Sequence, residues 1–109
     1  MSSDDRLEQR KQFRDAVNMS PRELEDWLAT EESRSVGDSD DGESTGHASG
    51  RRIVEIERKT VDELSDDDYD HMNKVVGYVH RHLAQRPDGD VTDTRWRWSL
   101  MNWGHDPLA

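Results

Sequence analysis

Cationic side chains occur in clusters along the chain, and clustered cations can bind phosphate groups. The longest cluster follows one side of a predicted helix, because its members are spaced three and four residues apart. It comprises His71, Lys74, Tyr78, Arg81 and Gln85. Arg86 follows it, Arg51 and Arg52 belong to a second cluster, and Arg95 and Arg97 form a third. If the fold brings these clusters together, they make a surface that can contact the phosphates of a nucleic acid.

Catalytic and metal-binding chemistry has little support in the residue pattern. The chain has no cysteine, no Gly-x-Ser-x-Gly elbow and no glycine-rich phosphate loop. Within one helix, His71, His80 and His82 cannot share a metal ion, because each pair lies on opposite faces or three turns apart. The run of aspartates from Asp66 to Asp70 is typical of a helix N-terminus. We therefore expect no enzymatic activity, no cofactor and no metal site.

The overall composition is acidic and poor in apolar residues. The 109 residues carry 25 acidic and 15 basic side chains, which gives a formal net charge of −10. Leu, Ile, Val and Phe number only 18 in total, and this combination is typical of disordered chains. The spacing of the apolar residues along the chain, rather than their number, must therefore show whether the chain folds.

Three features of the composition bear on location. No apolar run is long enough to span a bilayer, so no membrane partner is expected. The N-terminus is too charged for a signal peptide, and we expect a cytoplasmic protein. Arg outnumbers Lys by 12 to 3 and Asp outnumbers Glu by 16 to 9, which suits a halophilic cytoplasm and a GC-rich coding sequence equally well.

The spacing of apolar residues divides the chain into three parts. Residues 1–35 are predicted to form a pair of helices that docks on the core, and residues 36–49 an acidic, flexible linker. The second helix of the pair has a strong start signal, because Ser20 and Glu23 can form a capping box around Pro21. Residues 50–109 are predicted to form a helical core.

The predicted core contains one long helix and a tryptophan-rich C-terminal helix. Ser65 can cap the long helix and Pro87 stops it, while Gly104 is placed to end the tryptophan-rich one. Residues 49–59 read as a short helix, with a strand as the competing interpretation. The predicted fold is all-α, a compact bundle of four to five short helices with an acidic loop near residues 36–49. A sheet built on residues 51–56 is the alternative.

Helical periodicity also predicts which side chains are buried. Gly77 interrupts the long helix, which suggests close packing by the tryptophan-rich segment at that point. The predicted core comprises Leu24, Trp27, Leu28, Ile53, Ile56, Tyr69, Met72, Val76, Val79, Leu83, Trp96, Leu100 and Trp103.

Two long segments resemble a known family. HMNKVVGYVHRHLAQRP and RWSLMNWGHDP are similar to segments of domain-of-unknown-function family 3140, and the resemblance extends from about Phe13 to Leu108. Members of this family are small proteins without an established activity, and some carry a DNA-binding label. The resemblance thus implies nucleic-acid binding as one function, but it assigns no residues.

Two functions from different classes follow from these patterns. The first is a small non-enzymatic protein that binds double-stranded DNA through phosphate contacts. Its candidate residues are Arg51, Arg52, Lys74, Tyr78, Arg81, Arg86, Arg95 and Arg97. The second is a helical module that binds a protein partner or itself through a tryptophan-rich surface over residues 96–103, without nucleic acid. The net charge of −10 counts against the first function.

Overall fold

The predicted all-α fold is confirmed in the computed structural model, which describes residues 3–36 and 45–109. These residues form six α-helices and one 3₁₀ turn but no strand, so the sheet considered for residues 51–56 is wrong. The helices are α1 (Ser3–Ala16), α2 (Pro21–Leu28), α3 (Glu31–Ser35), α4 (Thr45–Glu57), α5 (Asp66–Leu83) and α6 (Arg95–Asn102), and η1 (Val61–Glu63) is the 3₁₀ turn. None of these helices is long and apolar enough to cross a membrane.

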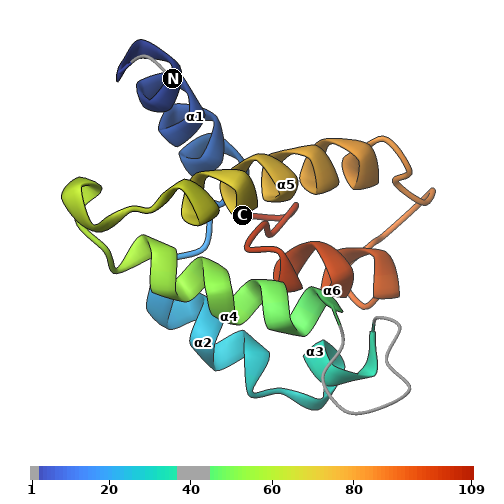
Figure 1. The fold of residues 1–109 in the computed structure, drawn as a ribbon. Helices are drawn as coiled ribbons and strands as arrows, with labels where there is room; N and C mark the ends of the chain where they lie inside the picture. The colour runs from blue at the N-terminus through green and yellow to red at the C-terminus, as the bar shows by residue number, and fades with distance from the viewer. Residues whose placement is uncertain (1–2, 37–44) are drawn as a thin grey trace.

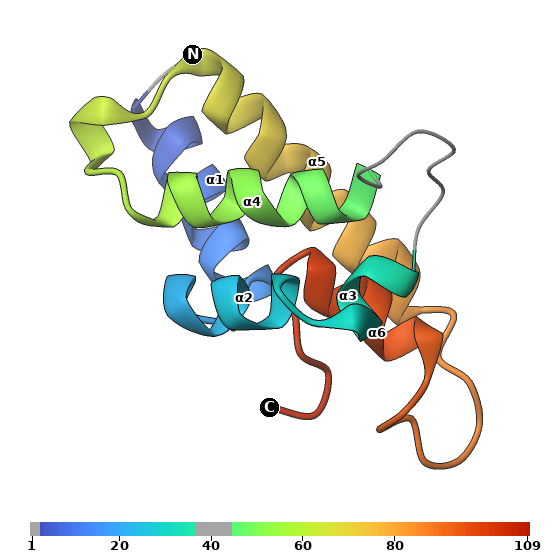
Figure 2. The ribbon, with the colours of Figure 1, turned by 90° about the horizontal axis from the view of Figure 1, so that it is seen from below.

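The helices pack as two pairs around α6. Helix α1 packs on α5, and α2 packs on α4, so each pair joins segments far apart in the sequence. Helix α6 contacts α2, α3, α4 and α5, and it lies between the two pairs (Figure 1). The view from below shows α4 crossing α5, with α2 on the other side of α4 (Figure 2).

Local capping signals fix where the helices begin. The Ser20 hydroxyl accepts a hydrogen bond from the Glu23 N–H while the Glu23 carboxylate accepts from the Ser20 N–H, which confirms the predicted capping box. Ser65 caps α5 in the same way, with Asp68 as its partner. Gly104 follows the end of α6 with a φ of 82°, a conformation that favours glycine.

The core contains the side chains that periodicity predicted, together with several from α1. Ten of the thirteen predicted residues are buried, and Trp27, Val76 and Leu83 are partly buried against them. The tryptophan-rich helix supplies the centre, because Leu100 is fully buried and both Trp96 and Trp103 are nearly so. The buried apolar residues beyond these thirteen are Phe13, Ala16, Val17, Met19, Val36, Val54, Val75 and Val91.

The close helix approach predicted at Gly77 occurs at Gly50 instead. A Cβ at Gly77 would meet only the side chain of Arg81, which lies on the same helix. A Cβ at Gly50 would lie 2.5 Å from the carbonyl oxygen of Asn102 and 2.7 Å from Leu28. Glycine is therefore required in α4, where α6 and α2 come closest to its backbone.

A buried amide joins the short helix α3 to the centre of the fold. The Asn102 side-chain oxygen accepts hydrogen bonds from Trp27 Nε1 at 2.8 Å and from the Ser33 hydroxyl at 2.5 Å. Its amide nitrogen donates to the Ser33 carbonyl at 3.0 Å. Ser33 and Asn102 are both almost fully buried, so these bonds satisfy polar groups that water cannot reach.

The acidic stretch predicted as a flexible linker falls partly outside the described residues. Residues 37–44, which carry all four of its acidic side chains, are not among them. Helix α4 already begins at Thr45, so the last five residues of the stretch 36–49 are helical. Val36, at its other end, is buried.

Candidate nucleic-acid interface

The cationic stripe predicted on α5 is only partly exposed. Lys74 and Arg81 lie on the solvent side of the helix, and within the described residues neither forms an ion pair. His71 and Tyr78 are half-buried because their rings turn toward Trp103 of α6. The stripe therefore offers two free cations, about 10 Å apart along the helix axis.

A ladder of stacked rings runs along the contact between α5 and α6. The closest pair is Tyr78 and Trp103, whose ring centroids are 4.2 Å apart and nearly parallel. Burial lowers the pKa of both His71 and His82 below the ordinary histidine value, so both imidazoles are neutral at pH 7. The two histidines thus pack and add no positive charge. The rings follow in the order His71, Trp103, Tyr78, His82 and Trp96.

The neighbouring arginines Arg51 and Arg52 point to different sides of α4. Arg52 donates a hydrogen bond to the carboxylate of Asp68 on α5 at 3.1 Å. Arg51 instead lines a shallow hollow beside Leu28 and His47, on the side of α2. The second cluster is therefore split, and Arg52 is paired with a carboxylate.

The third cluster is mainly used inside the fold. Arg97 Nε and Nη2 donate to the two carboxylate oxygens of Asp106, each at 3.1 Å. Burial alone would raise the pKa of Asp106, but the hydrogen bonds from Arg97 and Leu108 outweigh it and lower the pKa. Arg95 donates to the carbonyl oxygen of Ser35 at 3.0 Å and stays exposed. Arg97 therefore holds the C-terminal segment, while Arg95 keeps its charge at the surface.

The sequence leaves open whether the three clusters meet, and the structure places their members in different surroundings. Of the eight candidate residues, Arg52 and Arg97 are paired with carboxylates and Tyr78 belongs to the ring ladder. Arg86 is exposed, with its guanidinium 5.6 Å from the centre of the Trp96 ring. The candidates with charge at the surface are Arg51, Lys74, Arg81, Arg86 and Arg95.

The sequence interpretation missed the groups that neutralise these cations. Asp68 looked like one of several N-terminal aspartates, yet it is buried and accepts hydrogen bonds from Lys59 and Arg52. One signal was available, because Asp68 stands three residues after Ser65, the position of a capping-box acid. No local signal identifies Arg52 as its partner, since the two are 16 residues apart. Among the described residues, no group of three or more acidic or histidine side chains could hold a metal ion.

These features define a small all-α protein whose surface cations lie in separate groups on an acidic body. The family described as "Protein of unknown function (DUF3140)" matches residues 12–101, more than four fifths of the chain, and the chain belongs to this family. The resemblance noted in the sequence is thereby confirmed. Comparisons with curated proteins and with solved structures gave no match.

Proposed function

We propose that this protein binds the phosphate backbone of double-stranded DNA through exposed cations on α5. The observation that carries the proposal is the pair Lys74 and Arg81, which share one side of the helix and have no carboxylate partner within the described residues. Arg86, three residues after the end of α5, and Arg95, at the start of α6, are also exposed.

Unpaired cations matter more for this function than the number of cations. Lys59, Arg52 and Arg97 each form an ion pair, so phosphate contact would require breaking a bond that the fold already makes. Lys74 and Arg81 form no such pair within the described residues, so contact with a phosphate removes only part of their hydration. Each phosphate that they contact releases condensed counterions from DNA, which makes binding favourable and dependent on salt.

The acidic body limits the strength of this binding. A net charge of −10 repels DNA beyond the contact region, and screening by salt weakens the attraction of a few cations as well. We expect modest affinity, little sequence preference and a shallow salt dependence that reflects two to four phosphate contacts, roughly −2 to −4 in the slope of log K against log salt.

The buried tryptophans are the reason for preferring this function to the protein-interaction alternative. A tryptophan-rich interface needs exposed rings, but Trp96 and Trp103 belong to the core and Trp98 is half-buried. The two rings that anchor α6 are thus already packed against the protein's own side chains.

Fluorescence anisotropy with a labelled DNA duplex tests the proposal. Binding to the full chain is measured between about 20 and 200 mM salt, and the double variant Lys74→Ala/Arg81→Ala is compared with the wild type. Removing two phosphate contacts should weaken binding and reduce the salt slope by about 2.

A matched control removes two cations elsewhere. Lys11 on α1 and Arg22 on α2 are exposed, so Lys11→Ala/Arg22→Ala changes the net charge by the same amount. We expect this variant to keep most of the salt slope. Absence of binding at low salt, salt-independent binding, or equal loss in both double variants would each contradict the proposed function.

A further inference from the structure

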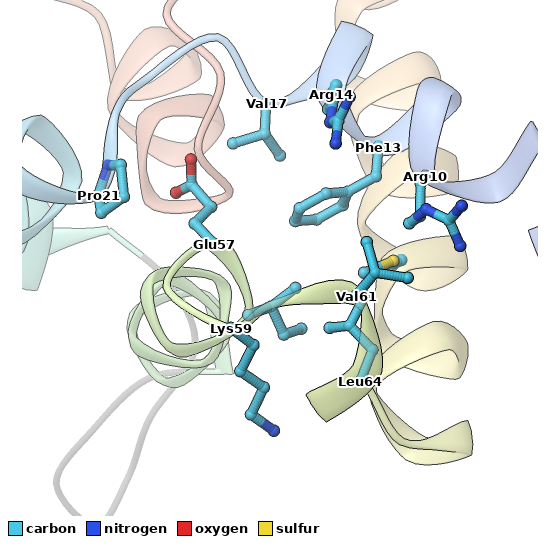
Figure 3. Close-up of a pocket in the computed structure, with 11 residues that line it drawn as sticks. Arg10, Phe13, Arg14, Val17, Pro21, Glu57, Lys59, Val61 and Leu64 are labelled. Carbon is cyan, nitrogen blue, oxygen red and sulfur yellow. The ribbon is translucent and has the colours of Figure 1, made fainter. Parts of the chain in front are cut away.

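A small cavity lies under α1, between that helix, α4, η1 and α5 (Figure 3). Its volume is about 200 Å³. Most of its walls are apolar, which gives it the character of a binding pocket for the apolar part of a small molecule. The apolar lining consists of Phe13, Val17, Pro21, Ile56, Val61, Leu64 and Met72.

One acidic side chain reaches into this apolar cavity. Glu57, at the end of α4, extends its carboxyl group toward Val17 and Pro21 (Figure 3). Its Oε1 atom is inaccessible to solvent and has no hydrogen-bond partner within the described residues. A buried carboxylate oxygen without a donor is costly, and proteins usually satisfy such an atom.

None of the cations near the cavity supplies the missing donor. Lys59 donates to Asp68 at 2.7 Å, and its chain extends away from the Glu57 carboxyl. Arg10 donates to the Tyr69 hydroxyl at 2.9 Å. Arg14 lines the cavity but is exposed to solvent.

Two further charged groups act on Glu57, one from α2 and one just after the end of α4. Arg58 favours its ionised form, but it forms an ion pair with Glu25. Glu23 opposes ionisation. Burial is the largest influence, and together these effects raise the pKa of Glu57 to about 7.

We infer that this cavity binds a small organic ammonium group carried on an apolar body, with Glu57 as its counter-charge. The ammonium N–H groups donate to the Glu57 carboxylate, which lines the cavity, and the apolar body replaces water against Phe13 and Met72. An apolar cavity of about 150 Å³ can hold a benzene molecule, so a four-carbon chain fits. An alkylamine and an apolar amino acid both present this chemistry.

The probes form a set matched in size. Butylamine carries the ammonium group alone, leucine adds a carboxylate that Arg14 can reach from the mouth, and butyrate carries only the anion. Each is titrated into the full chain, and binding is followed by NMR of the methyl groups of Val17, Val61 and Met72. We expect saturable shifts in these methyl groups with butylamine, with leucine, or with both, and none with butyrate.

Binding should also follow the ionisation of Glu57. With a pKa of about 7, the ionised fraction rises from about one hundredth at pH 5 to one half at pH 7. The affinity for butylamine should therefore increase about 50-fold between these pH values. This wild-type measurement needs no variant that could fail to fold.

Two substitutions on α4 localise the effect. Glu57→Gln keeps the shape and removes the charge, and it should weaken butylamine binding at least tenfold at pH 7. Glu55→Gln removes a charge from the exposed side of the same helix and should change nothing. The inference is overturned if butyrate binds as well as butylamine, if affinity is independent of pH, or if shifts are absent or unaffected by Glu57→Gln. None of these results depends on DNA binding.

Discussion

Asp68 and Glu57 are two sequestered carboxyl groups with opposite surroundings. Asp68 is about 1% exposed, and its two oxygens accept hydrogen bonds from Lys59, Arg52 and the Ser65 N–H. Glu57 faces an apolar cavity with one oxygen that accepts none within the described residues. Lys59 stands beside both groups, because it lines the cavity of Glu57 and donates to Asp68.

Burial raises the pKa of both carboxyls, and the presence or absence of hydrogen-bond donors decides whether that effect is overcome. Burial would raise the pKa of Asp68, but the bonds from Lys59, Ser65 and Arg52 outweigh it and hold the pKa well below its usual range. Burial raises the pKa of Glu57 to about 7, because Arg58 opposes it only in part. The fold therefore keeps one carboxylate permanently charged as a structural link and leaves the other able to change its charge near neutral pH.

Removing the satisfied carboxylate should have the largest effect on stability. Asp68→Asn keeps the shape but loses the charge that holds Lys59 and Arg52, and it weakens the cap of α5. We expect the free energy of unfolding to fall by about 3 kcal/mol, as when one partner of a buried ion pair is removed. Urea denaturation at pH 7 measures this loss.

The neighbouring Asp67 provides the control. It lies in the same first turn of α5 but is exposed, so Asp67→Asn should cost less than about 0.5 kcal/mol. Equal losses in the two variants would mean that helix-end charge, rather than the bonds of Asp68, stabilises α5.

Only part of this contrast could be predicted from the sequence. The cap of α5 is local, and Ser65 is predicted as the cap from its position just before the aspartate-rich first turn. The partners of Asp68 come from α4 and the segment after it, and their positions depend on how the helices pack. Glu57 looked like an ordinary charged residue, because nothing in its neighbours along the chain shows that a cavity forms beside it.

The distinction between local patterns and contacts set by helix packing also explains which other features the sequence predicts. The apolar periodicity of Ile53 and Ile56 correctly placed them in the core, because helical spacing is a local property. The close approach at Gly50 depends on α6 and α2, so it could not be located from α4 alone. Likewise, Arg97 meets Asp106 only because the chain turns at Gly104. Local patterns predicted the helices, whereas the free or paired state of each cation required the tertiary structure.

Replacing the unsatisfied carboxyl should have a smaller effect of opposite sign. Glu57→Gln removes a charge that the cavity disfavours, so we expect the free energy of unfolding at pH 8 to rise by about 1 kcal/mol, a value reduced for the partial exposure of the group. Glu57 holds its proton more tightly in the folded chain, with a pKa of about 7 against 4.5 in the reference state. Its penalty is therefore absent below pH 4.5, grows between 4.5 and 7, and is constant above.

The difference between wild type and variant isolates this effect. The pKa values of His71 and His82 are lowered in the fold, so these residues make stability rise with pH in a neighbouring range. Both variants keep them, and their contribution cancels in the difference. Chemical denaturation at pH 5 and pH 8 should show a much larger gain at pH 8, and Glu55→Gln should show none at either. A gain of equal size at pH 5 would contradict the assigned titration.

A comparably small effect is expected for the lysine that donates to Asp68 and lines the cavity of Glu57. Lys59→Met removes one of the donors to Asp68 but leaves Arg52 and the Ser65 N–H, so we expect a loss of about 1 kcal/mol. Lys59 points away from the Glu57 carboxyl, so the pKa of Glu57, followed by NMR titration, should not change. Lys11→Met, at an exposed site on α1, controls for the lost charge. If Lys59→Met raises the pKa of Glu57 while leaving stability intact, the lysine serves the cavity instead, and the contrast between the two carboxyls would have to be assigned to Arg52 and Ser65 alone.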